Sequence, residues 1–565
     1  MPRTRRQSAP RRGSGPDSGA PERGTGLSPR AALVALLVVI VLAALVRLRV
    51  SDVPLERDEG EYAYAGRLIR QGIPPYQAAY NMKFPGTYYA YALILAIFGA
   101  TPRGIHLGLL FVNAATTLLV FALGRRLLGN LAAAVAGAAF ALLTLDRWSM
   151  GVFAHATHFV LLPALGGLLV LLRAAESGGA AGYFGAGVLL GVSVLMKQHA
   201  VFFLPLGAAL TFRAEWGRGT RSPGALAKPL FSLAAGSALP LLVLIGVFAA
   251  QGVLERFWFW TFRYAGEYVS QVPLAHVLPG LLAGLGQVTA TNLWLWILGA
   301  AGLAALWVGT WDAAARTFIT GLLAASFLAV LPGFYFREHY FILLLPTVAL
   351  GVGVAVVALE NALRRLWSPG AARLLALAVF LGAAAHYVAT EREYLFSMTP
   401  LELCRKRYGL NPFVEAPEIA RYLRERTKPS DRIAVVGSEP EIYFYADRKS
   451  ATGYIYTYPL MEPQPFAARM QREMIEEIQA AYPSHLVFAK VVTSWLPRRD
   501  SDRTILTWVE RYTRECYDLV GIADIRSMDT TVYRFDADAA GYRTASDNAL
   551  FVFRRKEGGP CAPGR

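Results

Sequence analysis

The chain has 565 residues, of which 55% are hydrophobic, and this composition excludes an ordinary soluble protein of that size. Its formal net charge of +16 gathers in the first thirty residues and in short segments between long apolar runs. That distribution is typical of the cytoplasmic loops of membrane proteins, whereas a nucleic-acid-binding protein gathers its charge on one face. We therefore exclude nucleic acid as a partner and expect a polytopic helical protein in the lipid bilayer.

The N-terminal segment, residues 1–30, is rich in Arg, Pro, Gly and Ser, so we expect a disordered basic tail in the cytoplasm. The apolar run that follows is long enough to cross a bilayer. A cleaved signal peptide is the competing interpretation. We favour an uncleaved first span, because the run is too long and no small-residue cleavage site precedes Arg47.

Residues 31–390 hold eleven apolar runs that predict membrane-spanning helices. The runs lie near 31–50, 105–123, 131–145, 155–172, 183–196, 199–212, 229–250, 291–309, 317–333, 340–359 and 372–390.

Two further segments, 88–100 and 272–288, are too short or too interrupted by Pro, and we expect them to lie in the membrane interface. Counting 88–100 as a span would place the basic loop 213–228 outside, against the usual bias of positive charge. The eleven-span topology puts the N-terminus in the cytoplasm and the C-terminal region outside.

Residues 391–565 change composition and predict a small extracytoplasmic α/β domain. Strands are expected near 431–437, 485–489, 517–523, 531–535 and 550–553, and helices near 469–481 and 505–512. We find no catalytic motif in this region. The three cysteines have no metal-binding spacing, and whether Cys404 pairs with Cys516 is left open by the sequence.

Carboxylates cluster directly after the first apolar run, at Asp58, Glu59 and Glu61, and Lys83 follows some 25 residues later. A carboxylate can act as a general base or hold a divalent cation, and a lysine can neutralise a phosphate leaving group. Such a set at one membrane face suits a lipid-phosphate substrate. The alternative is a solvated loop whose charges merely pair with one another.

Other cationic residues fall on the same predicted face. Arg337, His339 and Tyr340 open one span, and Lys197 lies at the end of another. Together they can bind a phosphate or pyrophosphate group. The alternative for each is ordinary snorkelling of a long side chain at a helix end.

His155 and His158 are three residues apart and share one face of a predicted helix, where they can bind a metal ion. Two histidines without a third ligand are weak evidence, and structural packing is the favoured explanation.

These motifs, in this order, resemble the GT-C membrane glycosyltransferases that use polyprenyl-phosphate sugars, in the branch of the protein O-mannosyltransferases and aminoarabinose transferases. The family's Asp-Glu-x-x-Tyr-Ala loop is matched by Asp58-Glu59-Gly60-Glu61-Tyr62-Ala63, and its Lys-Pro-Pro element by Lys83-Phe84-Pro85, where Phe84 departs from the common Pro. Lys197-Gln198 and His339-Tyr340-Phe341 also resemble elements of the bacterial branch.

The resemblance covers residues 31–390. It departs from the family at His155-Ala156-Thr157-His158, where an acidic or Asn-x-Glu element is common.

The resemblance implies an inverting sugar transfer without a nucleotide. Asp58 would deprotonate or orient the acceptor hydroxyl, and Lys83, with Arg337 or His339, would stabilise the departing polyprenyl phosphate. Glu59 would support Asp58 or hold a cation, so a divalent cation stays open.

The remaining members of the predicted site are expected to support these groups or to help bind the donor phosphate. They are Lys197, Glu61, Tyr62, Tyr340, His155 and His158. The acceptor would be a lipid, a cell-envelope glycan or a protein, and the setting a bacterial inner membrane with an extracytoplasmic site.

Two other functions remain as alternatives. A transporter or flippase of lipid-linked sugars should show inverted repeats and ionisable residues near the middle of the membrane, whereas here the charges gather at one face. A membrane-anchored assembly factor would act through residues 391–565 and would not need Asp58.

Overall fold

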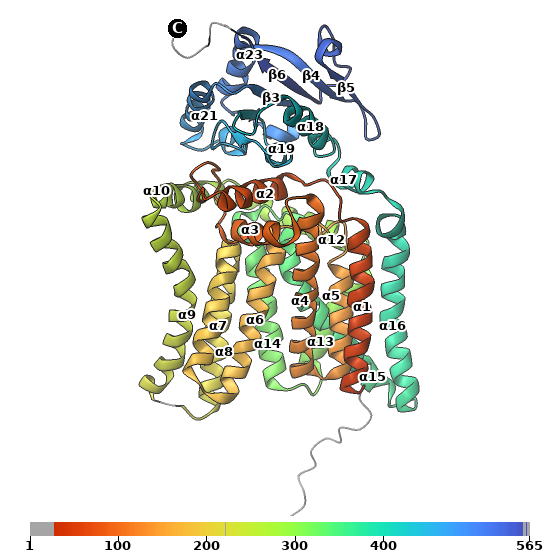
Figure 1. The fold of residues 1–565 in the computed structure, drawn as a ribbon. Coiled ribbons are helices and arrows are strands. Elements are labelled where there is room, and N and C mark those ends of the chain that lie inside the picture. The colour runs from red at the N-terminus through yellow and green to blue at the C-terminus, as the bar shows by residue number, and fades with distance from the viewer. Residues whose placement is uncertain (1–26, 221, 558–560, 562–565) are drawn as a thin grey trace, which may run out of the picture.

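The computed structural model describes residues 27–220, 222–557 and 561. Most of the predicted disordered tail, residues 1–26, lies outside the described part. Figure 1 shows a bundle of long helices with a smaller α/β domain stacked on one end. We call this end of the bundle, where the α/β domain sits, the domain-facing end.

The apolar runs of the sequence form the helices of the bundle. Within the described residues, seven helices are long and apolar enough to cross a membrane, or eight if one bent pair counts as a span. The prediction of a multi-pass membrane protein is therefore confirmed, while the count of eleven spans stays a prediction. The bundle helices are α1 (Pro29–Arg49), α4 (Pro102–Leu128), α5 (Asn130–Leu143), α6 (Ala156–Ser177), α7 (Ala180–Met196), α8 (Phe203–Gly217), α9 (Pro223–Ala250), α13 (Leu293–Val308), α14 (Ala313–Val330), α15 (Leu345–Leu363) and α16 (Pro369–Thr390).

Glycines let several of these helices approach one another closely. A Cβ on Gly302 of α13 would lie 1.8 Å from the carbonyl oxygen of Gly351 on α15. A Cβ on Gly236 of α9 would lie 2.1 Å from the carbonyl oxygen of Phe184 on α7. Small residues at such crossings are a common means of packing helices in a membrane, where van der Waals contact replaces the hydrophobic effect.

Shorter helices lie between the bundle and the α/β domain. Figure 1 shows α2 (Arg57–Arg70) and α3 (Gly86–Phe98) crossing the domain-facing end of the bundle, as the sequence predicted for segment 88–100.

A second group of short helices follows α9. It runs through α10 (Leu254–Trp258), a π-helical turn η2 (Phe259–Tyr264) and α11 (Ala265–Val269). A bend of 75° then leads to η3 (Leu274–His276) and α12 (Val277–Thr289). The predicted interfacial segment 272–288 thus forms the second arm of a bent pair.

The C-terminal domain is built on one six-stranded mixed sheet of order β2-β1-β3-β6-β4-β5. Strands β2, β1 and β3 are parallel, and the remaining pairs are antiparallel. The predicted strands are all present, and only the two-residue β2 was missed. The strands are β1 (Arg432–Val436), β2 (Lys449–Ser450), β3 (His485–Lys490), β4 (Tyr517–Ile525), β5 (Thr531–Phe535) and β6 (Ala549–Arg555).

The helices of this domain cover the sheet and its approach from the bundle. They are α17 (Pro400–Tyr408), α18 (Ala416–Arg426), α19 (Pro440–Ala446), α20 (Tyr458–Met461), α21 (Ala467–Ala481), α22 (Val492–Trp495) and α23 (Thr504–Cys516). Cys516, at the end of α23, forms a disulfide with Cys561, and Cys404 is a free, buried thiol. The pairing of Cys404 with Cys516 that the sequence left open is therefore not the one that forms.

The domain docks on α2 through a close backbone contact and a buried ion pair. A Cβ on Gly60 would lie 2.6 Å from the backbone nitrogen of Glu441 in α19. Beside it, the Arg57 guanidinium donates to the carbonyl oxygen of Ser438 at 2.6 Å and pairs with Glu439 at 3.4 Å. Both contacts fix α2 against the α/β domain.

We expect Gly60→Ala to weaken this docking. Alanine favours a helix, but its Cβ overlaps the backbone of α19, and overpacking of this kind costs about 1–3 kcal/mol. A lower melting temperature of the purified protein checks this. In the control Gly382→Ala on α16, the added Cβ has nothing within 4 Å. That variant should melt at the temperature of the parent or slightly above it. Equal melting of the Gly60 variant and the parent would contradict the tight contact.

Candidate active site

Helix α2 begins at a capping box that fixes the direction of its first turn. The Glu56 carboxylate accepts from the backbone nitrogen of Glu59 at 2.9 Å, and the Glu59 carboxylate accepts from that of Glu56 at 3.2 Å. Such reciprocal bonds satisfy amide groups that the first turn leaves unpaired. The carboxylate of Asp58 is thereby held at the edge of a cavity.

Lys83 bridges two carboxylates of α2. Its ammonium nitrogen lies 2.8 Å from Asp58 Oδ1 and 2.6 Å from Glu61 Oε2, and 4.7 Å from the centre of the Tyr62 ring. The Tyr88 hydroxyl donates to the other oxygen of Glu61. The sequence predicted Asp58, Glu61, Tyr62 and Lys83 as one group, and the structure brings them together.

The electrostatics of this group keep Asp58 and Lys83 ionised, while burial raises the pKa of Glu61. Burial alone would raise the pKa of Asp58, but the Lys83 ammonium and His155 outweigh burial and hold this pKa well below its usual value. Burial alone would lower the pKa of Lys83, but Asp58 and Glu61 raise this pKa well above its usual value. The site thus contains a stable carboxylate and a stable ammonium side by side.

A cavity of about 460 Å³ opens beside Asp58 and Lys83. Five other predicted residues line it, and these are Tyr62, Lys197, Arg337, His339 and Tyr340. The cavity continues between apolar and aromatic side chains, among them Phe84, Val201, Phe202, Phe262 and Val269. It therefore combines a cationic end with an apolar extension.

Lys197 and Arg337 are the cations of the cavity that lack a carboxylate partner. The Lys197 ammonium lies 4.0 Å from the centre of the Tyr340 ring, and the Arg337 guanidinium lies 5.6 Å from that of Tyr335. In the part of the chain that the structure describes, neither has an ion pair. Burial is the main cause that lowers the pKa of Lys197 to about 7; the charge of Asp58 opposes it, and the charges of Lys83 and Arg337 add to it.

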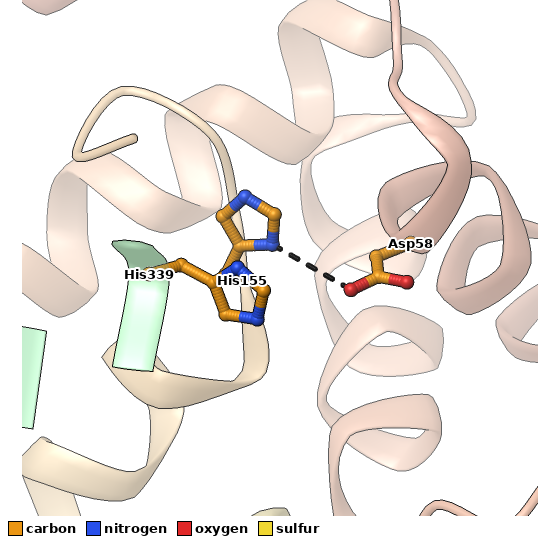
Figure 2. Close-up of side chains that lie close together, drawn as sticks. All are labelled: Asp58, His155 and His339. Atoms are coloured by element: carbon orange, nitrogen blue, oxygen red, sulfur yellow. Dashed lines mark ion pairs between the residues drawn. The ribbon is translucent and has the colours of Figure 1, made fainter. Parts of the chain in front are cut away.

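Two histidines approach Asp58 from other elements (Figure 2). His155 caps α6, with its Nδ1 3.8 Å from Asp58 Oδ2, and its ring stacks on that of His339 at 4.3 Å. One ligand atom from each of Asp58, His155 and His339 lies within 4.8 Å of the others.

The buried nitrogens of these rings fit a metal ion. Both ring nitrogens of His155 and the Nδ1 of His339 are buried and have no hydrogen-bond partner among the described residues. Two imidazoles and one carboxylate are the donor set of many zinc sites, and the fourth position is then free for a substrate oxygen. These three residues can therefore hold a divalent cation, although Asp58 already pairs with Lys83.

Four predicted site residues do not line the cavity, namely Glu59, Glu61, His155 and His158. The Glu59 carboxylate accepts from His106 Nε2 at 3.0 Å and from the backbone nitrogen of Ala154. His158 is buried within α6, and neither of its ring nitrogens has a hydrogen-bond partner among the described residues. The structure thus separates Glu59 from Asp58 and His158 from His155.

The C-terminal domain contributes side chains to the cavity that the sequence analysis missed. Tyr456, Tyr458 and Glu462 line it, and Lys83 lies 5.5 Å from the centre of the Tyr456 ring. The run Gly453-Tyr454-Ile455-Tyr456-Thr457-Tyr458-Pro459 was the available signal, because three tyrosines before a proline are unusual in a connecting segment. The domain therefore forms part of the candidate site.

Comparisons with known proteins agree with this geometry. A family model described as dolichyl-phosphate-mannose-protein mannosyltransferase matches residues 82–245, which include Lys83 and Lys197. No curated protein matches the sequence.

Solved structures match most of the chain. ArnT from Cupriavidus metallidurans bound to undecaprenyl phosphate is similar at 16% identity and a TM-score of 0.56, over 90% of this chain and 99% of that one. The chain has the GT-C fold. An Archaeoglobus fulgidus oligosaccharyltransferase tethered to an acceptor peptide is similar at 12% identity and a TM-score of 0.50, over 89% of this chain and 74% of that one. At the level of the fold, the resemblance that the sequence motifs indicated is thus confirmed.

We expect the purified protein to retain a divalent transition metal at about one ion per chain, because sites of two imidazoles and a carboxylate prefer such metals. Elemental analysis by mass spectrometry measures the metal content. The variant His155→Ala should lose the ion, and the control His158→Ala, three residues along the chain, should keep it. A metal content of His155→Ala equal to that of the parent would contradict the site.

Proposed function

We propose that the protein is a membrane glycosyltransferase that moves a hexose or pentose from a polyprenyl-phosphate donor to the hydroxyl of an extracytoplasmic acceptor, with inversion at the anomeric carbon. The observation that carries this proposal is the cavity itself. Lys83, Lys197 and Arg337 face it together with the carboxylate of Asp58. Cations next to a carboxylate suit a reaction in which a phosphate leaves while a hydroxyl loses its proton.

The shape of the cavity supports a donor with a lipid tail. Its cationic end lies next to α2, while Val201, Phe202 and Val269 line its extension. A phosphate bound at the cationic end would continue into an apolar chain along these residues. A nucleotide sugar would instead place a polar base and ribose there, at a cost in desolvation.

The reaction would follow from the pairing of Asp58 with Lys83. A bound donor phosphate competes for the Lys83 ammonium, and as Lys83 turns toward the phosphate, the pKa of Asp58 rises toward its ordinary value. Asp58 then accepts the proton of the acceptor hydroxyl as its oxygen bonds to the anomeric carbon. The electron pair of the breaking bond goes to the phosphate oxygen, whose charge Lys83, Lys197 and Arg337 stabilise.

A divalent cation at Asp58, His155 and His339 would supply a further positive charge beside the reacting oxygens. Within the chain itself, His339 lines the cavity next to Asp58, and the ring of His155 stacks on it and holds it in place.

In this proposal, Glu59 does not react but holds other residues of the site in place. Its carboxylate links α2 to Ala154, the residue directly before His155. It thus holds Asp58 and His155 in register.

Two observations support an extracytoplasmic site in an inner membrane. The described positive charges of the short loops Arg125, Arg126 and Arg364 lie at the end of the bundle opposite the C-terminal domain. The Cys516–Cys561 disulfide belongs to that domain, and disulfides persist in oxidising compartments. A bacterial cell envelope provides both the polyprenyl phosphate and hydroxyl-rich acceptors.

We expect Asp58→Asn and Lys83→Met each to lower the transfer rate by a factor on the order of 10²–10³, since each removes one charge from the transition state. Transfer of radiolabelled sugar from polyprenyl phosphate to membrane-extract acceptors measures this rate. Asp529→Asn, in an exposed turn of the C-terminal domain, is the control and should keep the parent rate. If the parent and both variants flip lipid-linked sugar at the same rate, and none of the three transfers sugar, the result would instead support a transporter.

We expect donor binding to weaken as the pH rises through about 7. Lys197 is cationic below its pKa of about 7 and neutral above it, while the phosphodiester of the donor stays singly negative. Affinity should fall up to about tenfold per pH unit above that value. Lys197→Arg keeps its charge, so its affinity should stay nearly constant between pH 6 and about 8.5. Titration of a polyprenyl-phosphate sugar by calorimetry tests this, and parallel pH profiles for parent and variant would exclude Lys197 as the cause.

A further inference from the structure

A second and larger cavity lies beside the candidate active site. It has a volume of about 1260 Å³ and opens between α9, the segment from α10 through η2, and α21 of the C-terminal domain. We call it the lateral groove. It contains none of the residues proposed to act on the donor.

The lateral groove extends from the membrane to the C-terminal domain. Its deepest lining residue on α9, Leu241, lies nine residues before the end of that helix at Ala250. At 1.5 Å per residue this corresponds to roughly 13 Å of depth along the helix. Because α9 is long and apolar enough to span a membrane, a groove along its last turns suits the apolar tail of a membrane lipid.

Aromatic side chains line the groove near the end of α9. Trp258 is 51% exposed there and its ring stacks on that of Phe262 with 4.4 Å between ring centres, while Phe259 and Trp260 also line the groove. Exposed tryptophan at the membrane surface is common, but here it forms one wall of a cavity whose opposite wall is the α/β domain. Flat aromatic faces of this kind are suited to stack against the apolar face of a sugar ring.

The polar end of the lateral groove carries both signs of charge. Arg263 and Glu476 line it, and within the described residues neither has an ion pair or a side-chain hydrogen bond. Two of its other carboxylates are held in place, since Glu477 accepts from the Tyr80 hydroxyl at 3.0 Å and from Thr452 at 2.6 Å, and Glu473 pairs with Arg469 at 3.3 Å. A mixture of donors and acceptors suits a hydroxyl-rich neutral head group, in contrast to the cationic end of the catalytic cavity.

One short segment separates the two cavities. The π-helical turn Phe259–Tyr264 presents Trp260 and Arg263 to the lateral groove, and Thr261 and Tyr264 to the catalytic cavity. Phe262 lines both and is 40% exposed. Single π-helical turns are rare and are frequently found at functional sites. A molecule in the lateral groove would therefore meet the reaction centre across Phe262.

We propose that the lateral groove binds the acceptor, and that the acceptor is a glycolipid whose sugar stacks on Trp258 while its apolar chain follows α9. That the bound molecule is the acceptor rests on the proposed function. That it is a glycolipid rests on the residues of the lateral groove alone. The donor and the acceptor then approach the same reaction centre from the two sides of η2.

Photolabelling tests the proposal in the full-length protein. The protein is reconstituted in nanodiscs of phosphatidylethanolamine and phosphatidylglycerol, and labelled with dodecyl maltoside that carries a diazirine in its alkyl chain. Mass spectrometry of the labelled peptides locates the probe. We expect label on α9 and on residues 254–263, lowered about fivefold or more in Trp258→Ala and in Arg263→Ala, as loss of a stacking contact or a charged hydrogen bond implies.

Matched controls separate this result from a loss of structure or from general lipid binding. Trp294→Ala removes a tryptophan of 52% exposure on α13, and Arg103→Ala removes an exposed arginine at the start of α4. Both should label as the parent does. A diazirine probe with a phosphocholine head group should label the groove several-fold less than the maltoside.

Three results would overturn the proposal. They are equal labelling by the maltoside and the phosphocholine probe, labelling that is unchanged in Trp258→Ala and Arg263→Ala, and preferential labelling of the groove by a diazirine-bearing polyprenyl phosphate. The last would assign the groove to the donor chain. Because labelling needs no sugar transfer, an inactive protein that still labels as expected would overturn the proposed function and leave the lateral groove intact.

Discussion

A charged helix buried on both sides is the constraint on which the site depends. Helix α2 lies between the bundle and the C-terminal domain. The charged side chains of its first turn each pair with a different neighbour, and Glu61 shares Lys83 with Asp58. Arg57 pairs with the domain, Asp58 with Lys83, and Glu59 with His106. A buried charge without a partner costs several kcal/mol, so these pairs fix both the position of α2 and its rotation about the helix axis. The active-site carboxylate is held there because its neighbours along the helix are already engaged.

Helical geometry explains why adjacent carboxylates have different surroundings. Neighbouring residues of a helix point about 100° apart, so Asp58 and Glu59 cannot both face one cavity. Asp58 and Glu61 are three residues apart and share a face, which is why one lysine bridges both. The structure therefore brings Asp58, Glu61 and Lys83 of the motif together, and helical spacing explains why Glu59 lies apart from them.

Other parts of the site depended on tertiary structure. Lys83 and Lys197 could be found from sequence because each lies next to an apolar run whose end is predictable. The stacking of His155 on His339 joins residues far apart in the chain, and no local pattern records their contact. Tyr456 and Tyr458 belong to a domain that was predicted correctly as α/β, yet their place in the cavity follows only from the docking of that domain on α2.

The docking contact has a consequence for how separable the two halves of the protein are. Open α/β sheets usually bind their ligands in the crevice beyond the carboxyl ends of parallel strands. Here Ser438 and Glu439 follow β1 and Ser494 follows β3, and this crevice is filled by the Arg57 side chain. In this sheet, the place where a ligand usually binds is therefore occupied by the side chain of Arg57. A chimera with a different C-terminal domain would need a crevice that accepts the Arg57 side chain. The two halves are therefore expected to change together rather than as independent modules.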